Sequence, residues 1–118
     1  MTKTLSKKLE DARKEGKELS PELVSLMQKA RKASDFLKAI AHENRLVILC
    51  LLSERERSVT ELEGLLALSQ ATVSQQLARL RHEGLVETRR DGRAVYYRLA
   101  DETTRRFTQA IYDKFCRN

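Results

Sequence analysis

Apolar residues recur at helical spacing over the first part of the chain and predict two helices. Ser20 followed by Pro21 marks the start of the first, because serine is a favoured N-cap and proline fits the first helical position. Its apolar stripe consists of Leu23, Leu26, Met27, Ala30, Leu37, Ile40 and Ala41. Residues 42–44 interrupt this stripe. A second helix over residues 45–53 is almost entirely apolar, which predicts that it is buried.

Two shorter helices are expected next. The segment 58–61 (SVTE) fits a capping box, in which Ser58 caps the helix and Glu61 reaches back to it. This helix is expected to bury Leu62, Leu65 and Leu66. Ala67 and Leu68 form a turn, and Ser69 caps the following helix. On that helix Val73, Leu77 and Leu80 share one face, which predicts that the face packs on the core.

The spacing changes to alternation after residue 85 and predicts a hairpin. Asp91-Gly92 is a favoured two-residue type I′ turn, and counting back from it pairs Arg90 with Arg93, Thr88 with Val95 and Val86 with Tyr97. This register places Val86, Val95, Tyr97 and Leu99 on one face. Asp101 then caps a last helix with a stripe of Phe107, Ile111 and Phe115, which we expect to pack on the first long helix or on its copy in a second chain.

The expected fold is mainly α with a small β-hairpin, in the order α-α-α-α-β-β-α, which is a winged helix-turn-helix. Residues 1–18 are expected to form a charged tail or frayed helix, and residues 19–118 a single domain with dimerisation helices at both ends. A chain of 118 residues supports only a modest core, and such cores are often completed by dimerisation. A homodimer is therefore expected.

Charge and composition favour a polyanionic partner. The chain has 23 Lys and Arg against 17 Asp and Glu, a net charge of +6, and a basic balance of this kind suits nucleic acid. No apolar run is long enough to span a membrane. We therefore expect a cytoplasmic protein whose two cysteines are reduced thiols.

The outward face of the helix after Ser69 carries amides, hydroxyls and a guanidinium, with no acid before Glu83. Glutamine can pair with adenine and arginine with guanine, whereas hydroxyl groups and a helix N-terminus suit phosphate. Arginines at the hairpin tip would reach the DNA backbone or the minor groove. The predicted DNA-binding residues are Ser69, Gln70, Thr72, Ser74, Gln75, Gln76, Arg79, Arg89, Arg90 and Arg93. Which of them read bases and which hold phosphate stays open.

The segment ELEGLLALSQATVSQQLARLRHEGLVETRRDGRAVYYRL, residues 61–99, resembles the ArsR family of small winged-helix repressors. The resemblance implies a homodimer, joined through its first and last helices, that leaves a palindromic operator of double-stranded DNA when an inducer binds. Two positions depart from the family pattern: residues 42–44, where His-Pro is common, and Ala67, where the turn glycine is common. A left-handed alanine there would cost on the order of 1 kcal/mol.

Metal sensors of this family carry Cys-x-Cys where this chain has Ser58 and Thr60, and zinc sensors carry histidine on the last helix, which has none here. No metal and no cofactor are expected. The chain instead has Cys50 and Cys116, whose placement is similar to the persulfide-sensing SqrR/BigR-like branch. In that branch reactive sulfur species bridge the two thiols and DNA is released, which implies control of sulfide oxidation and detoxification genes. The cations Lys114 and Arg117 favour Cys116 as the first nucleophile.

Three alternatives stay open beside this hypothesis. The same repressor could respond to general oxidants through a plain disulfide, which needs Cα atoms within about 7 Å. A constitutive architectural DNA-binding protein would leave both cysteines inert. A thiol–disulfide enzyme is disfavoured, because the chain has neither Cys-x-x-Cys nor a βαβ pattern, so no enzymatic activity is expected.

Overall fold

The computed structural model describes residues 7, 10–11 and 18–117. The chain divides into two compact units, Met1–Leu37 and Lys38–Asn118, and each is described by itself. The charged tail expected over residues 1–18 lies almost entirely outside the described residues. The division into a tail and a single domain from residue 19 therefore stays a prediction.

Helix α2 spans Pro21–Ile40 and begins where the sequence predicts. The Ser20 hydroxyl accepts a hydrogen bond from the backbone N–H of Leu23 at 3.2 Å, as expected of an N-cap. Large apolar side chains along the helix stay about half exposed: Val24 at 41%, Leu26 at 50% and Leu37 at 49%. Two members of the predicted stripe, Leu26 and Leu37, are thus about half exposed.

Helix α3, Glu43–Glu54, begins two residues before its expected start, because His42 caps it. The His42 Nδ1 accepts from the Asn44 backbone N–H at 3.2 Å. Ile48, Leu49 and Leu52 are buried, but Val47 is 45% exposed. The prediction that the whole helix is buried was therefore wrong: α5, α6 and β3 cover only part of its circumference.

Helices α4, Val59–Leu66, and α5, Gln70–His82, are joined by a tight turn at Ala67. Ala67 has φ 55° and ψ 41°, the left-handed conformation anticipated for it. Leu62, Val73, Leu77 and Leu80 are fully buried, whereas Leu65 is 53% exposed, contrary to expectation. The two N-caps form as predicted, with the hydroxyls of Ser58 and Ser69 accepting from Glu61 N at 3.1 Å and Thr72 N at 3.2 Å.

The Glu61 side chain does not complete the expected capping box. Its carboxylate accepts hydrogen bonds from the guanidinium groups of Arg55 and Arg57, the latter at 2.7 Å. These two arginines draw the carboxylate away from the backbone of Ser58, so only half of the predicted motif forms.

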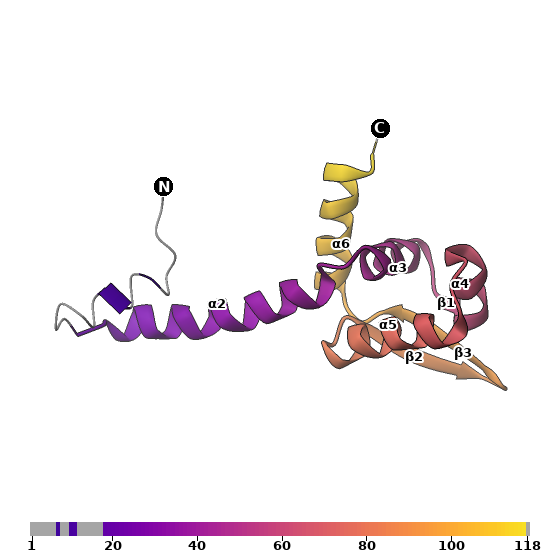
Figure 1. The fold of residues 1–118 in the computed structure, drawn as a ribbon, viewed down its shortest axis with the longest axis horizontal. Helices are drawn as coiled ribbons and strands as arrows, with labels where there is room; N and C mark the ends of the chain where they lie inside the picture. The colour runs from indigo at the N-terminus through magenta and orange to yellow at the C-terminus, as the bar shows by residue number, and fades with distance from the viewer. Residues whose placement is uncertain (1–6, 8–9, 12–17, 118) are drawn as a thin grey trace. The chain divides into compact units, whose positions relative to one another are not determined.

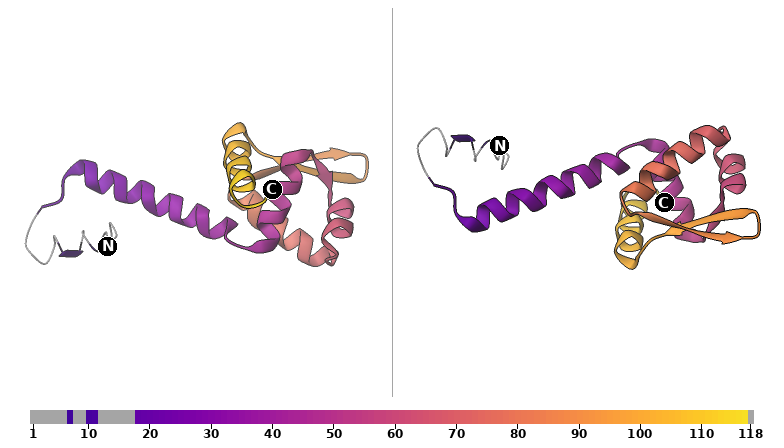
Figure 2. Two further views of the ribbon diagram at one scale, coloured as in Figure 1. Left: turned by 90° about the horizontal axis from the view of Figure 1, so that it is seen from above. Right: turned by 90° about the horizontal axis from the view of Figure 1, so that it is seen from below.

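Strands β2, Val86–Asp91, and β3, Ala94–Leu99, form the hairpin. A short third strand, β1, Arg57–Ser58, pairs with β3 and was not predicted from the sequence. The strand order is β1-β3-β2, all antiparallel. Both views in Figure 2, like Figure 1, show the β2–β3 hairpin, here called the wing, extending beyond the neighbouring helices.

The predicted hairpin register was wrong by two residues. Val86 pairs with Leu99, Thr88 with Tyr97 and Arg90 with Val95. The turn residues are Gly92 and Arg93 instead of Asp91 and Gly92, and of these only Gly92 has a positive φ, 63°. A glycine at the first central position is typical of a type II′ turn. Because strand faces repeat every two residues, a slip of two leaves the expected faces unchanged.

Helix α6, Glu102–Phe115, packs against α3. Asp101 caps it as predicted, accepting from Thr104 N at 2.7 Å. Arg105 donates to the Ser53 carbonyl at 2.9 Å and so joins α6 to the last turn of α3. Of the predicted stripe, Phe107 and Ile111 are half-buried and Phe115 is 77% exposed; Tyr112, outside the stripe, is 44% exposed. Within the described ranges, no helix is long and apolar enough to cross a membrane.

Candidate DNA-binding surface and cysteine pair

Helix α5 presents a polar outer face above its buried one. Ser69, Gln70, Ser74, Gln75 and Arg79 are exposed, and Thr72 and Gln76 are half-buried. The first turn contains no acidic residue, so the N-terminal end of the helix dipole is not neutralised from within the helix. The arrangement leaves amide and hydroxyl groups along one side of an accessible helix.

Several of these side chains already have partners within the chain. The hydroxyls of Ser69 and Thr72 lie 2.9 Å apart and close the first turn of α5. Arg79 pairs with Glu83 at 3.6 Å. Gln76 accepts a hydrogen bond on Oε1 from Arg45 Nη1 of α3 at 2.9 Å. Gln70 and Gln75 have no such partner within the described residues.

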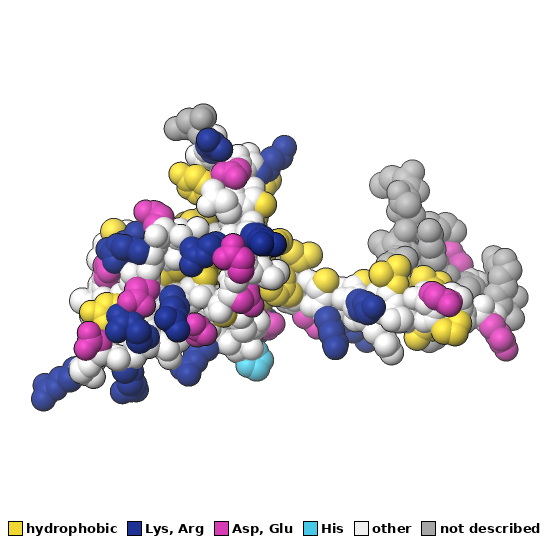
Figure 3. Space-filling model, turned by 180° about the vertical axis from the view of Figure 1, so that it is seen from behind, with side chains coloured by type: hydrophobic (Ala, Val, Ile, Leu, Met, Phe, Trp, Pro, Cys, Tyr) yellow, Lys and Arg dark blue, Asp and Glu magenta, His cyan; other side chains and the backbone are white. Residues whose placement is uncertain are grey.

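The three arginines predicted for the wing fall into two groups. Arg89 is held by Glu56: its Nε lies 3.2 Å from both carboxylate oxygens, and its guanidinium carbon lies 4.8 Å from the centre of the Tyr96 ring. The hydrogen bond from Arg89 lowers the pKa of Glu56. Arg90 and Arg93 are exposed, and Lys and Arg side chains project from this end of the molecule in Figure 3.

A buried arginine, Arg57, was missed by the sequence analysis. It is only 8% exposed, and it donates to the Leu51 carbonyl at 3.1 Å and to the Glu61 carboxylate at 2.7 Å. It thereby satisfies a terminal carbonyl of α3 and joins α3 to α4. Hydrogen bonds from Arg55, and then from Arg57, lower the pKa of Glu61. The sequence signal was the alternation of acids and bases in residues 54–57.

The two cysteines lie on α3 and α6, the helices that pack together. Cys50 is half-buried, Cys116 is exposed at the C-terminal cap of α6, and both are free thiols. Burial raises the pKa of Cys50, and negative charge on Cys116 and Glu54 raises it further. The two thiols are therefore within electrostatic range of each other. Arg117, expected to assist Cys116, pairs with Asp113 at 3.9 Å.

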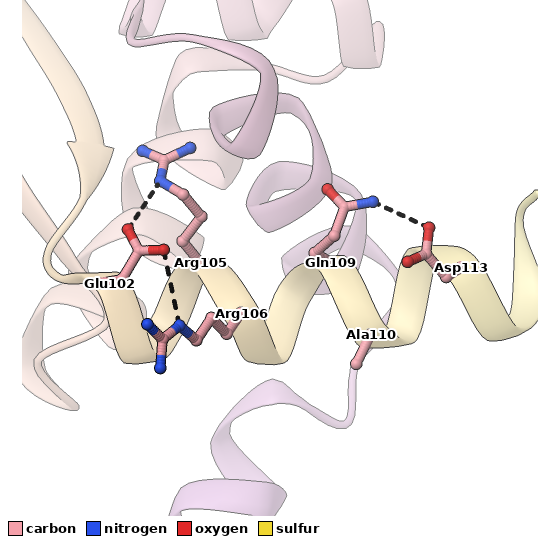
Figure 4. Close-up of a pocket in the computed structure, with 6 residues that line it drawn as sticks. All are labelled: Glu102, Arg105, Arg106, Gln109, Ala110 and Asp113. Atoms are coloured by element: carbon pink, nitrogen blue, oxygen red, sulfur yellow. Dashed lines mark hydrogen bonds and ion pairs between the residues drawn. The ribbon is translucent and has the colours of Figure 1, made fainter.

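No group of three or more His, Cys, Asp or Glu side chains suited to a metal ion occurs among the residues described. A shallow hollow runs along α6 (Figure 4), lined by Glu102, Arg105, Arg106, Gln109, Ala110 and Asp113. Glu102 pairs with both arginines, and Gln109 donates to Asp113 at 2.9 Å. The charged groups of this hollow thus largely satisfy one another.

A short helix, a tight turn, an accessible second helix and a basic hairpin together define a winged helix-turn-helix, a class of DNA-binding regulator. Residues 42–88 match the family described as bacterial regulatory protein, arsR family. The chain is 42% identical over 94 residues to the biofilm growth-associated repressor of Agrobacterium fabrum, covering 80% of each chain. It is 40% identical over 94 residues to the transcriptional activator HlyU of Vibrio cholerae, covering 80% of this chain and 87% of that one. The protein belongs to the ArsR family.

Solved structures agree with this assignment. Reduced HlyU from Vibrio cholerae is similar with a TM-score of 0.75 at 40% identity, covering 79% of this chain and 98% of that one. The repressor BigR from Xylella fastidiosa gives a TM-score of 0.70 at 39% identity, covering 78% and 91%. A homodimeric winged helix-turn-helix domain from Mycobacterium bovis gives 0.67 at 32% identity, covering 85% and 93%. The predicted fold class is confirmed, and the protein is a DNA-binding transcriptional regulator.

Proposed function

We propose that the protein is a cytoplasmic, homodimeric repressor that leaves its operator when reactive sulfur species bridge Cys50 and Cys116. The observation that carries the proposal is the position of the two thiols. They lie on two helices in contact, α3 and α6, and the charge of one affects the pKa of the other. The controlled genes would be those for sulfide oxidation and detoxification.

The apolar side chains left open on α2 and α6 support a homodimer. Leu26 and Leu37 on α2 are about half exposed, and Phe115 on α6 is 77% exposed. Exposed large apolar side chains on a helix can mark an interaction surface. A second copy would cover them and place two α5 helices over half-sites roughly 34 Å apart.

The proposed chemistry begins at Cys116, because Cys116 is exposed whereas burial raises the pKa of Cys50 and so disfavours its thiolate. The Cys116 thiolate attacks the central sulfur of an organic trisulfide and displaces one thiolate. Cys50 then gives up its proton, attacks the same sulfur and displaces the second thiolate. Two protein thiols are oxidised to a trisulfide bridge, and the reagent is reduced to two small thiols.

Such a bridge can affect DNA binding because the two helices have different roles. Helix α3 contacts α5 and β3, which carry the DNA-binding surface, whereas α6 carries part of the expected dimer interface. A covalent link would fix their spacing and therefore the separation of the two α5 helices. A hundredfold release requires only about 2.7 kcal/mol of difference between the two forms.

Two other readings differ in what the thiols do. A general oxidant would join the two thiols as a disulfide. One similar structure is described as reduced HlyU, so a reduced form of that relative is named as such. A constitutive DNA-binding protein would ignore thiol reagents altogether. Relatives named as a repressor and as an activator both occur, so the direction of regulation also needs a direct test.

The test uses the full chain and operators selected by the reduced protein from a random duplex library. Affinity is titrated for reduced, trisulfide-treated and peroxide-treated protein, with the intact mass measured on the same samples. A trisulfide adds one sulfur and removes two hydrogens, whereas a disulfide only removes two hydrogens. The proposal expects loss of affinity with the added sulfur, and none in Cys116→Ser. The proposal would be overturned if the trisulfide-treated wild type kept its operator affinity. It would also be overturned if trisulfide treatment made the Cys116→Ser variant release the operator.

A further inference from the structure

Arg45 links three parts of the DNA-binding unit. Its guanidinium Nε donates to the carbonyl of Ala39 in the last turn of α2, and its Nη1 donates to Oε1 of Gln76 on α5 at 2.9 Å. Ala39 is fully buried and Arg45 itself is half-buried. One guanidinium therefore holds the Gln76 side chain against the body of the protein.

This contact settles which atom of the Gln76 amide faces Arg45. Arginine has donors and no acceptor, so the atom that meets it is the amide oxygen and not the nitrogen. The oxygen and the NH2 group lie on opposite branches of the planar amide. With the oxygen turned towards α3, the NH2 group is the branch left to face away from the protein.

Gln75, its neighbour on α5, provides the contrast. It is exposed and has no partner in the described part of the chain, so both ends of its amide are available to a base. Adenine offers an acceptor and a donor side by side in the major groove, and guanine and thymine offer acceptors there. The two adjacent glutamines are thus prepared for different bases.

We infer that Arg45 is a positioning residue for sequence readout, because it holds Gln76 so that its amide NH2 is presented to the major groove. Gln76 then favours a base that offers an acceptor in the major groove, which guanine, thymine and adenine do, over cytosine, which offers only a donor. The inference rests on the proposed function only in taking the outer face of α5 as the surface that meets the bases.

The experiment compares operator selection from a random duplex library by the wild type, Gln76→Ala, Arg45→Met and Arg45→Lys, with Gln75→Ala as the matched control. Gln76→Ala and Arg45→Met should lose preference at the same base position, by roughly fivefold, which is the contribution of one hydrogen bond. Their combination should lose no more. Arg45→Lys keeps a donor and should retain the preference, and Gln75→Ala should alter a different position.

A second variant tests the orientation without removing Arg45. Gln76→Glu keeps the size of the side chain and the bond to Arg45 but has only acceptors, so the preferred base should change to cytosine, which offers only a donor. An unchanged preference in Gln76→Glu would overturn the inference. A wild-type base preference in Arg45→Met would also overturn the inference. A salt slope of DNA binding that is lower by about one in Arg45→Met would do the same, since it would mean that Arg45 contacts a phosphate directly.

These outcomes distinguish the role inferred for Arg45 from the proposal that the outer face of α5 meets the bases. If Gln76→Ala loses base preference and the Arg45 variants do not, α5 reads DNA and only the role of Arg45 is wrong. If neither Gln75→Ala nor Gln76→Ala changes the selected sequence, the assigned reading face and the inference both fail. Thermal unfolding of each variant shows whether it is folded at the assay temperature.

Discussion

Replacing Ala67 with glycine should stabilise the protein, because Ala67 holds a conformation that glycine adopts without strain. At φ 55° and ψ 41° it caps α4, and its backbone N–H bonds to the Glu63 carbonyl. A left-handed residue other than glycine costs roughly 1–2 kcal/mol. Glycine removes that strain but gives the unfolded chain more freedom, which offsets about 0.4–1 kcal/mol. The expected net gain is about 0.5–1 kcal/mol.

Two glycines of the same domain serve as matched controls. A Cβ added at Gly84 or at Gly64 meets no atom within 4 Å, so packing plays no part in either change. Gly84 has φ 74°, and Gly84→Ala should destabilise by about 1 kcal/mol for the reason that Ala67→Gly stabilises. Gly64 lies inside α4, and Gly64→Ala should stabilise by about 0.5–1 kcal/mol through helix propensity.

The assay is urea unfolding at fixed protein concentration, because the stability of the proposed dimer would depend on concentration. Ala67→Gly should raise the midpoint with an unchanged slope, and operator affinity should stay as it is, since Ala67 carries no side chain able to contact a base. A lower midpoint for Ala67→Gly, alongside the expected fall for Gly84→Ala, would refute the assignment of strain to this turn.

The other predictions concern charge and the thiols. Glu56→Gln releases Arg89, so DNA affinity at low salt should rise and the salt slope should steepen by up to about one; an unchanged slope would mean that Arg89 never reaches phosphate. Arg90→Ala and Arg93→Ala should each weaken binding to all sequences alike and flatten the slope by about 0.9 per phosphate lost, measured by titration at several salt concentrations. Because a raised pKa means less thiolate at a given pH, Cys50 in Cys116→Ser should be alkylated more slowly than a cysteine peptide at neutral pH. The two rates should converge only at alkaline pH, and equal rates at neutral pH would contradict the effect of burial.

Local signals in the sequence were sufficient for most of the fold. The caps at Ser20, Ser58, Ser69 and Asp101 all form, because an N-cap depends on a few consecutive residues. The hairpin faces were also predicted correctly although its register was not. Alternation fixes which side chains share a face, whereas the position of the turn depends on which residue takes a positive φ.

Several of the missed features depend on contacts between residues far apart in the sequence or between oppositely charged side chains. Strand β1 exists because residues 57–58 meet β3, about forty residues further along. Arg89 and Gln76 were predicted as DNA-binding side chains, and within the chain Glu56 holds the first and Arg45 the second. The exposure patterns of their own helices and strands gave no sign of these partners. Sequence reasoning located the candidate DNA-binding surface and could not say which of its groups are already engaged.

Helix α3 carries both the residue that positions Gln76 and one of the two thiols, which suggests how the two could be connected. Arg45 and Cys50 are five residues apart, so on an α-helix they point about 140° away from each other. Arg45 bonds to Gln76 on α5, whereas Cys50 lies within range of the charge of Cys116 at the end of α6. The bond from Arg45 to Gln76 is 2.9 Å long, and hydrogen bonds weaken steeply with small displacements. A sulfur bridge between Cys50 and Cys116 would thus act on base selection only if it also shifted α3 against α5.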